Sequence, residues 1–129
     1  MGVYIANKVI KLMATRKLPI HQANVLMLGI TFKENCPDIR NSKVADLVNE
    51  LKSFGTNVDI YDPHANAEEV KQEYGFNLIS RLSKKYHAVV LAVSHDEFKS
   101  LPWDKIKDSN TVVYDVKGFL DKGFVTARL

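Results

Sequence analysis

Short apolar runs alternate with amphipathic segments along most of the chain. Residues 24–29 form a continuous apolar run that stops at a glycine, and 88–93 form a second run, which is typical of strands buried on both faces of a sheet. After the first run, apolar residues from Val44 to Phe54 recur at intervals of three and four, and Gly55 follows as a stop signal. The pattern therefore predicts a strand, a loop and a helix in the first half of the chain.

The remaining elements are shorter but have clear boundaries. Pro63 ends a predicted strand at 58–62, and Asn66 with Glu69 three residues later predicts a capped helix that Gly75 terminates. The further expected elements are a strand at 76–79, a helical turn or two at 80–85, a short helix around 102–106 and a last strand at 111–114. Strands that alternate with helices predict an α/β fold: a doubly wound, Rossmann-like parallel sheet of five strands. With the strands numbered along the chain, their expected order across the sheet is 3-2-1-4-5.

The first 20 residues have a different character. Apolar residues recur at helical spacing up to Met13, with Lys8, Lys11 and Arg16 among them, so we expect an amphipathic helix that ends before Pro19. These charges exclude a signal-peptide core and a membrane-spanning helix. The segment from Gly2 onward resembles the middle of a protein more than its beginning, and the helix need not belong to the sheet.

Composition restricts the class of protein. With 129 residues, 46% of them hydrophobic, the chain suits one soluble globular domain. The net charge of +3 is not gathered into basic runs, so we expect no nucleic-acid and no membrane partner. Cys36 is the only cysteine, which excludes an internal disulfide and a Cys/His metal cluster and fits a reducing cytoplasm.

Candidate chemistry lies at the carboxyl ends of the predicted strands, where such sheets bind ligands. We expect residues 25–40 to form a phosphate-facing first turn, but it has one glycine where a dinucleotide fingerprint needs three. Lys33 and Arg40 supply positive charge instead, unless both are ordinary solvated loop cations. Lys117 follows the last strand toward the same edge, and Phe32 stands beside Lys33, a combination that suits a diphosphate carrying a flat or sugar group.

Three other residues have two interpretations each. Asp62 ends the second strand, where it either holds ribose hydroxyls or, as we favour, forms an Asp-Pro turn. His95 lies near a ligand or in a segment where Ser94 or Asp96 caps the next helix; we favour capping. Cys36 has no histidine close in sequence and precedes a proline turn, so a structural loop cysteine is favoured over a nucleophile.

Three stretches of the sequence together resemble a known family. They are Leu28-Gly-Ile-Thr-Phe-Lys-Glu-Asn-Cys-Pro-Asp-Ile-Arg-Asn-Ser-Lys43, Glu50-Leu-Lys-Ser-Phe-Gly55 and Val58-Asp-Ile-Tyr-Asp-Pro-His64. In this order and spacing they resemble the C-terminal domain of the UDP-glucose/GDP-mannose dehydrogenases, in particular the bacterial branch that acts on UDP-N-acetylhexosamines. The resemblance extends from about Asn24 to Asp121.

The resemblance implies an oxidoreductase of polysaccharide precursor synthesis. Intact members oxidise a sugar C6 alcohol to a carboxylate, through two NAD reductions and a thioester at a cysteine. Their N-terminal domain binds NAD, the central domain forms the homodimer and part of the active site, and the C-terminal domain holds the nucleotide end of the UDP-sugar. By this resemblance, residues 1–22 are a helical segment that joins a central domain, and 23–129 are the nucleotide-sugar-binding domain.

The same resemblance assigns residues. Phe32 and Lys33 would contact the UDP-sugar, Lys117 or its neighbour Gly118 would also contact it, and Arg40 would reach the NAD site. Cys36 does not match the catalytic cysteine, and no catalytic residue of the family falls within this chain, so we expect the chain alone to be inactive. Two other classes stay open: a free-standing regulatory α/β module, which acidic strand ends would favour, and an interaction domain that dimerises through the opening helix.

Overall fold

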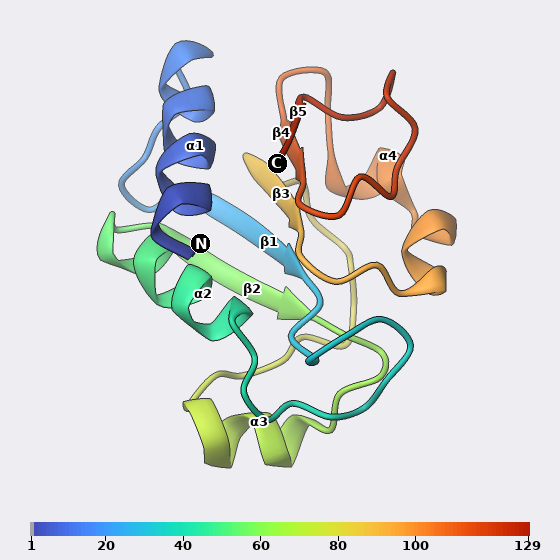
Figure 1. The fold of residues 1–129 in the computed structure, drawn as a ribbon. Helices are drawn as coiled ribbons and strands as arrows, with labels where there is room; N and C mark the ends of the chain where they lie inside the picture. Colours follow the sequence, from blue (N-terminus) through green and yellow to red (C-terminus); the bar gives the residue numbers. More distant parts are fainter. Residues whose placement is uncertain (1) are drawn as a thin grey trace.

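A computed structural model describes residues 2–129 and shows one five-stranded parallel sheet (Figure 1). Its order is β2-β1-β3-β4-β5, and all four strand pairs are parallel. The strands are β1 (Asn24–Leu28), β2 (Asn57–Tyr61), β3 (Ala88–Leu91), β4 (Val112–Asp115) and β5 (Ala127–Arg128). The helices are α1 (Gly2–Thr15), α2 (Val44–Ser53), α3 (Ala67–Tyr74), the 3₁₀ helix η1 (Asp96–Ser100) and α4 (Trp103–Ile106).

The predicted α/β class, parallel sheet and strand order are confirmed, with two differences in the strands. The predicted strand at 76–79 is a single bridge, Leu78 beside Ile60 on β2, where the predicted order places it. The fifth strand of the sheet is instead β5, which was not predicted because a pair of residues carries no periodicity.

The predicted helical turn at 80–85 is wrong. The segment is irregular in the structure, and among its residues only Leu82 is partly buried. Because the other five side chains are exposed, the segment has no apolar face that could hold a helix against the sheet.

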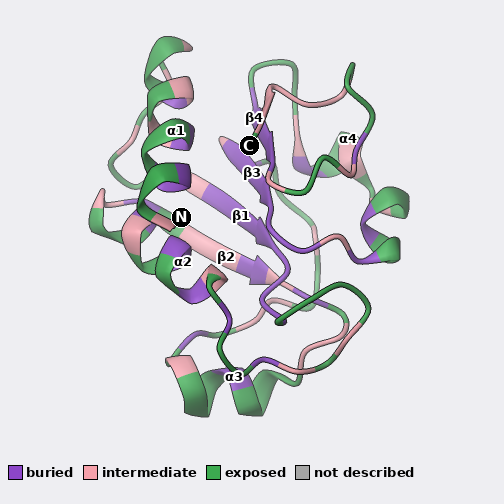
Figure 2. Ribbon diagram, in the orientation of Figure 1, coloured by how far each residue is buried: buried purple, intermediate pink, exposed green. Residues whose placement is uncertain are grey.

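Alternate residues of each central strand face two separate cores. On β1, Val25 and Met27 belong to a core that α1 and α2 cover, whereas Leu26 and Leu28 belong to a core that η1 and α4 cover. Figure 2 shows β1 and β3 buried along most of their length, as expected for strands in the middle of a parallel sheet covered on both faces. The continuous apolar runs in the sequence have this physical origin.

Helix α1 packs on the first of these cores. Its buried residues Ile5, Ala6, Val9 and Met13 join the same cluster as those of α2, and Figure 1 shows the two helices on one side of the sheet. The predicted amphipathic helix ending before Pro19 is confirmed. Among residues 2–129, no helix combines the length and the apolar character that a membrane crossing needs.

The predicted limits of α3 are confirmed in detail. The Asn66 side chain accepts a hydrogen bond from the Glu69 backbone N–H at 3.1 Å. At the other end, Gly75 adopts a left-handed conformation with φ of 76° and its N–H donates to the Lys71 carbonyl. The α3 segment thereby turns back toward the sheet edge at β2, beside the loop that precedes α2 (Figure 1).

Candidate functional site

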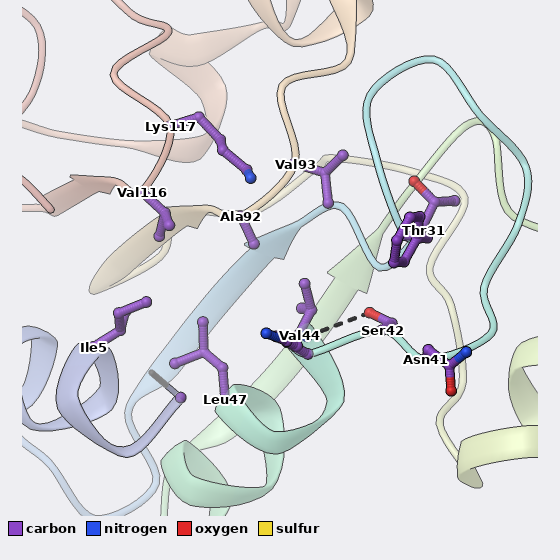
Figure 3. A pocket seen from close by; sticks show the side chains of 13 residues that line it. Ile5, Thr31, Asn41, Ser42, Val44, Leu47, Ala92, Val93, Val116 and Lys117 are labelled. Carbon is purple, nitrogen blue, oxygen red and sulfur yellow. Dashed lines mark hydrogen bonds between the residues drawn. The ribbon is translucent and has the colours of Figure 1, made fainter.

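A cavity of about 230 Å³ opens at the carboxyl ends of β1, β3 and β4 (Figure 3). Three segments that are distant in the sequence form it: the loop after β1, the start of α2 and the turn after β4. Its lining residues are Gly2, Ile5, Thr31, Phe32, Asn41, Ser42, Lys43, Val44, Leu47, Ala92, Val93, Val116 and Lys117. The cavity lies where the sequence predicted a ligand site, at the edge where parallel strands end.

Two of the predicted site residues come together in this cavity. Phe32 is 59% exposed, so its ring is available to a ligand. Lys117 extends toward Ala92 and Val93, which also line the cavity (Figure 3). Its turn is fixed by the fully buried Asp115, whose carboxylate accepts hydrogen bonds from the N–H groups of Lys117 and Leu120.

The N-terminus of α2 is a part of the cavity that sequence reasoning did not single out. Ser42 and Lys43 lie in its wall, and the Ser42 hydroxyl accepts a hydrogen bond from the Val44 N–H (Figure 3). Tyr74 of α3 holds the segment that leads into α2, because its hydroxyl donates to the Ile39 carbonyl and accepts from the Ser42 N–H. The first turn of a helix attracts anions, and the sequence signal was available: Lys43 stands directly before the first apolar residue of the helix.

The other two predicted cations lie elsewhere. Lys33 is exposed, and it is not among the residues of 2–129 that line the cavity. Arg40 lies in a separate hollow with Glu69 and Glu73, and its guanidinium grips Asp38 through two hydrogen bonds of 3.1 Å. These hydrogen bonds to Arg40 lower the pKa of Asp38, and the same pairing raises the pKa of the arginine.

A buried network fixes the start of the loop after β1. The Asp62 carboxylate accepts hydrogen bonds from the backbone N–H groups of Ile30, Thr31 and His64, and lies 3.0 Å from Nε2 of His95. The favoured turn function of Asp62 is confirmed by the bond from His64. Although burial is the largest influence and raises the pKa of Asp62, the bonds from His95, Ile30 and His64 together lower it.

The favoured capping function of the segment after β3 is wrong. Neither Ser94 nor Asp96 caps η1: its N-cap is His95, and no side chain of the cap makes a capping hydrogen bond. His95 is instead fully buried and bonds to residues of the first loop. A histidine within a polar loop sequence gave no sign of burial, because the partners that satisfy it come from two other segments.

The single glycine of the first loop serves packing. Gly29 has φ of 99°, and a Cβ there would lie 2.6 Å from Cβ of Val93. The ends of β1 and β3 therefore approach too closely for any other residue. Cys36 is a free, partly exposed loop cysteine, and the described part of the chain contains no group of three side chains placed to hold a metal.

This geometry, an α/β domain with a cationic and aromatic cavity at its strand ends, is that of a nucleotide-binding domain. The chain matches the sequence model "UDP-glucose/GDP-mannose dehydrogenase family, UDP binding domain" over residues 26–122. It therefore belongs to the UDP-glucose/GDP-mannose dehydrogenase family, which confirms the resemblance seen in the sequence.

Curated relatives extend far beyond this chain. A UDP-N-acetyl-D-glucosamine 6-dehydrogenase of Pseudomonas aeruginosa is 40% identical over all of the chain and 32% of its own length. A Salmonella typhi protein of the same name is 43% identical over 91% of the chain and 28% of its own length, and protein CapL of Staphylococcus aureus is 42% identical. The chain thus spans about a third of the length of these relatives.

Solved structures support the fold. The UDP-N-acetyl-mannosamine dehydrogenase of Staphylococcus aureus superposes on 98% of this chain with a TM-score of 0.74 and 22% identity, over 30% of its own length. A UDP-glucose dehydrogenase of Pyrobaculum islandicum gives a TM-score of 0.74 at 20% identity, covering 97% of this chain. At such identities the similarity concerns the fold.

Proposed function

We propose that the cavity at the carboxyl ends of β1, β3 and β4 binds the UDP part of a UDP-sugar. One observation supports this proposal above the others. Phe32 and Lys117, which the family resemblance assigns to the substrate, line one cavity, and both lie within the stretch that matches a UDP-binding domain.

Each part of the cavity has a chemical use in this proposal. The exposed ring of Phe32 offers a flat apolar surface to the uracil or the sugar. Lys117, Lys43 and the first turn of α2 supply positive potential for the diphosphate. Lys33 joins the site if the ligand extends beyond the cavity mouth, since its side chain is exposed beside Phe32.

We further propose that the longer protein is an NAD-dependent 6-dehydrogenase of a UDP-N-acetylhexosamine, working in the cytoplasm as a homodimer. The names of the relatives from Pseudomonas aeruginosa and Salmonella typhi support this substrate class. NAD would supply the hydride acceptor that converts the C6 alcohol to a carboxylate. The first turn of this chain has one glycine, Gly29, where a dinucleotide fingerprint needs three. We therefore assign NAD to another part of the protein, with Arg40 as the contact from this chain.

Calorimetric titration of the 129-residue chain tests the nucleotide site. We expect UDP and UDP-N-acetylglucosamine to bind and NAD to give no heat. A Lys117→Ala variant is expected to weaken UDP binding about tenfold, because one charged contact to a phosphate is worth about 1.4 kcal/mol or more. Lys105→Ala is the control, since this exposed lysine belongs to α4 on the opposite face of the sheet. An absence of UDP heat at millimolar concentration, or unchanged binding by the Lys117 variant, would refute the proposal.

A further inference from the structure

The ring of His95 lies fully buried under the loop that carries Phe32 and Lys33. Two other rings lie tilted against it, with centroid distances of 4.3 Å to His64 and 5.2 Å to Phe98. Its own segment follows β3, whereas its hydrogen-bond partners belong to the loop after β1 and to the end of β2. One side chain therefore joins three segments next to the nucleotide cavity.

The hydrogen bonds determine which nitrogen of His95 carries the proton. Nδ1 lies 2.8 Å from the backbone nitrogen of Asn35, and a backbone N–H can only donate, so Nδ1 is an acceptor without a proton. Nε2 then carries the hydrogen and donates to Asp62 Oδ2 at 3.0 Å. Thr31 Oγ1, at 3.1 Å from Nε2, donates its own hydrogen to the Lys33 carbonyl. The buried ring is neutral, and each of its nitrogens has a partner.

These bonds hold the loop on both sides of Phe32 and Lys33. Thr31 precedes the two residues and Asn35 follows them, and both touch the same imidazole. Asn35 adopts a left-handed backbone with φ of 54°, and its side-chain oxygen accepts a second bond from the Asp96 N–H at 3.1 Å. Since Phe32 is itself exposed, the anchorage of the loop comes from its ends and from the bond between the Phe32 N–H and the Asp38 carbonyl.

We propose that His95 is a positioning residue of the nucleotide site: through Asn35 and Thr31 it fixes the turn that presents Phe32 to the UDP-sugar and carries Lys33 next to it. This inference rests on the proposed function, because only a nucleotide site gives the position of the turn an effect on ligand binding. The hydrogen bonds that anchor the turn are present in the chain without a ligand. A preorganised loop binds more tightly because its ordering cost is met before the ligand arrives.

The chain contains a matched control in His87. Its Nδ1 also accepts a hydrogen bond from a backbone N–H, that of Asn24, at 3.0 Å. His87 immediately precedes β3 and Asn24 begins β1, so this bond lies at the amino ends of the strands, away from the cavity. Loss of an equivalent bond there disturbs stability without touching the loop after β1.

The experiment compares three variants of the 129-residue chain with the unmodified chain: His95→Leu, His95→Asn and His87→Leu. UDP affinity is measured by calorimetry, and amide hydrogen exchange is measured for residues 31–35 without ligand. We expect His95→Leu to weaken UDP binding about tenfold or more and to speed exchange of the Asn35 amide, whose acceptor is lost. Asparagine places an oxygen near the position of Nδ1, so His95→Asn should recover most of the affinity. His87→Leu should leave UDP affinity within about twofold.

The two measurements separate failure of this inference from failure of the proposed function. If the unmodified chain does not bind UDP, the proposed function is wrong, and the exchange at residues 31–35 still decides whether His95 anchors the turn. Unchanged exchange and affinity in His95→Leu would overturn the inference. Equal losses of affinity in the His95 and His87 leucine variants would also overturn it, because they would show a general effect of stability.

Discussion

Four donors converge on the carboxylate of Asp62, a residue that the sequence presented as an ordinary turn aspartate. Three are backbone N–H groups, and the fourth is Nε2 of His95. Asp62 is only 5% exposed, so these bonds replace the water that a carboxylate would otherwise hold. The residue joins the end of β2 to the beginning of the loop after β1, and its ionised form is the one that the fold stabilises.

Asp62 therefore makes stability depend on pH in the acid range. Its pKa is lowered in the folded state relative to about 3.9 in an unfolded chain, so the folded state binds fewer protons there. The stabilisation is complete above about pH 5 and is lost as the pH falls through the lowered folded pKa. We expect Asp62→Asn to be destabilised by roughly 2–3 kcal/mol at pH 7 in urea unfolding, with the difference from the unmodified chain shrinking below about pH 4.

Asp38 is the control for this measurement. It also has a lowered pKa, but its partner Arg40 is 81% exposed and water screens the pair. Asp38→Asn should leave the stability unchanged at every pH. A constant difference between the unmodified chain and Asp62→Asn from pH 7 to pH 3 would show that the Asp62 carboxylate does not carry the acid dependence.

Helix α3 shows how far local sequence determines an element. Both of its ends are formed by nearby residues, Asn66 at the start and Gly75 at the stop, and both were predicted from the sequence. Val70 is its only buried residue and Tyr74 its other contact with the core, so only a narrow face of the helix packs against the rest of the domain. The ends of α3 should therefore matter more to its stability than those of a helix with a broad buried face.

Two glycines test the stop signal of α3. A Cβ would meet nothing within 4 Å at Gly75 or at Gly123, but only Gly75 has a positive φ, of 76°. Gly75→Ala should cost about 1 kcal/mol, because a side chain disfavours the left-handed conformation. Gly123→Ala should have no cost, since alanine reduces the freedom of the unfolded chain. The measurement is urea unfolding, and equal effects of the two changes would contradict the assignment.

Helix α1 packs on one of the two cores that lie on opposite faces of the sheet. Val9 and Met13 are fully buried in the cluster that also contains residues of α2, β1 and β4. Gly2 lies against α2, since a Cβ there would be 3.0 Å from the Leu47 nitrogen. The opening helix thus covers a sheet face that would otherwise be exposed.

Two valines on α1 measure this contribution. Val9 is 0% exposed and Val3 is 55% exposed, so the same substitution removes the same atoms from a core and from a surface. Val9→Ala should cost about 2 kcal/mol, from lost burial and a residual cavity. Val3→Ala should change stability by less than about 0.5 kcal/mol, because alanine favours the helix and little burial is lost. Similar effects in urea unfolding would show that α1 is not packed on the sheet.

The sequence by itself determined the fold class, the order of strands in the sheet and the family. Continuous apolar runs indicate buried strands, and capping residues indicate helix ends. Both signals are local, because residues close together in the sequence carry them. The predicted helical turn at 80–85 failed, since the polar side chains of that segment had no face to pack. The edge strand β5 was not predicted, because two residues show no periodicity and the strand is defined by its pairing with β4.

The tertiary structure decided which of the predicted residues share the candidate site and which other residues join them. Phe32, Lys43 and Lys117 lie around one cavity, whereas Arg40 lies in a separate hollow with Asp38. His95 is buried under the loop that carries Phe32. His95 and Asn35 are separated by 60 positions in the chain, so no local pattern of apolar and polar residues records their contact. Local periodicity specifies which segments form strands and helices; only the folded chain brings side chains from distant segments together.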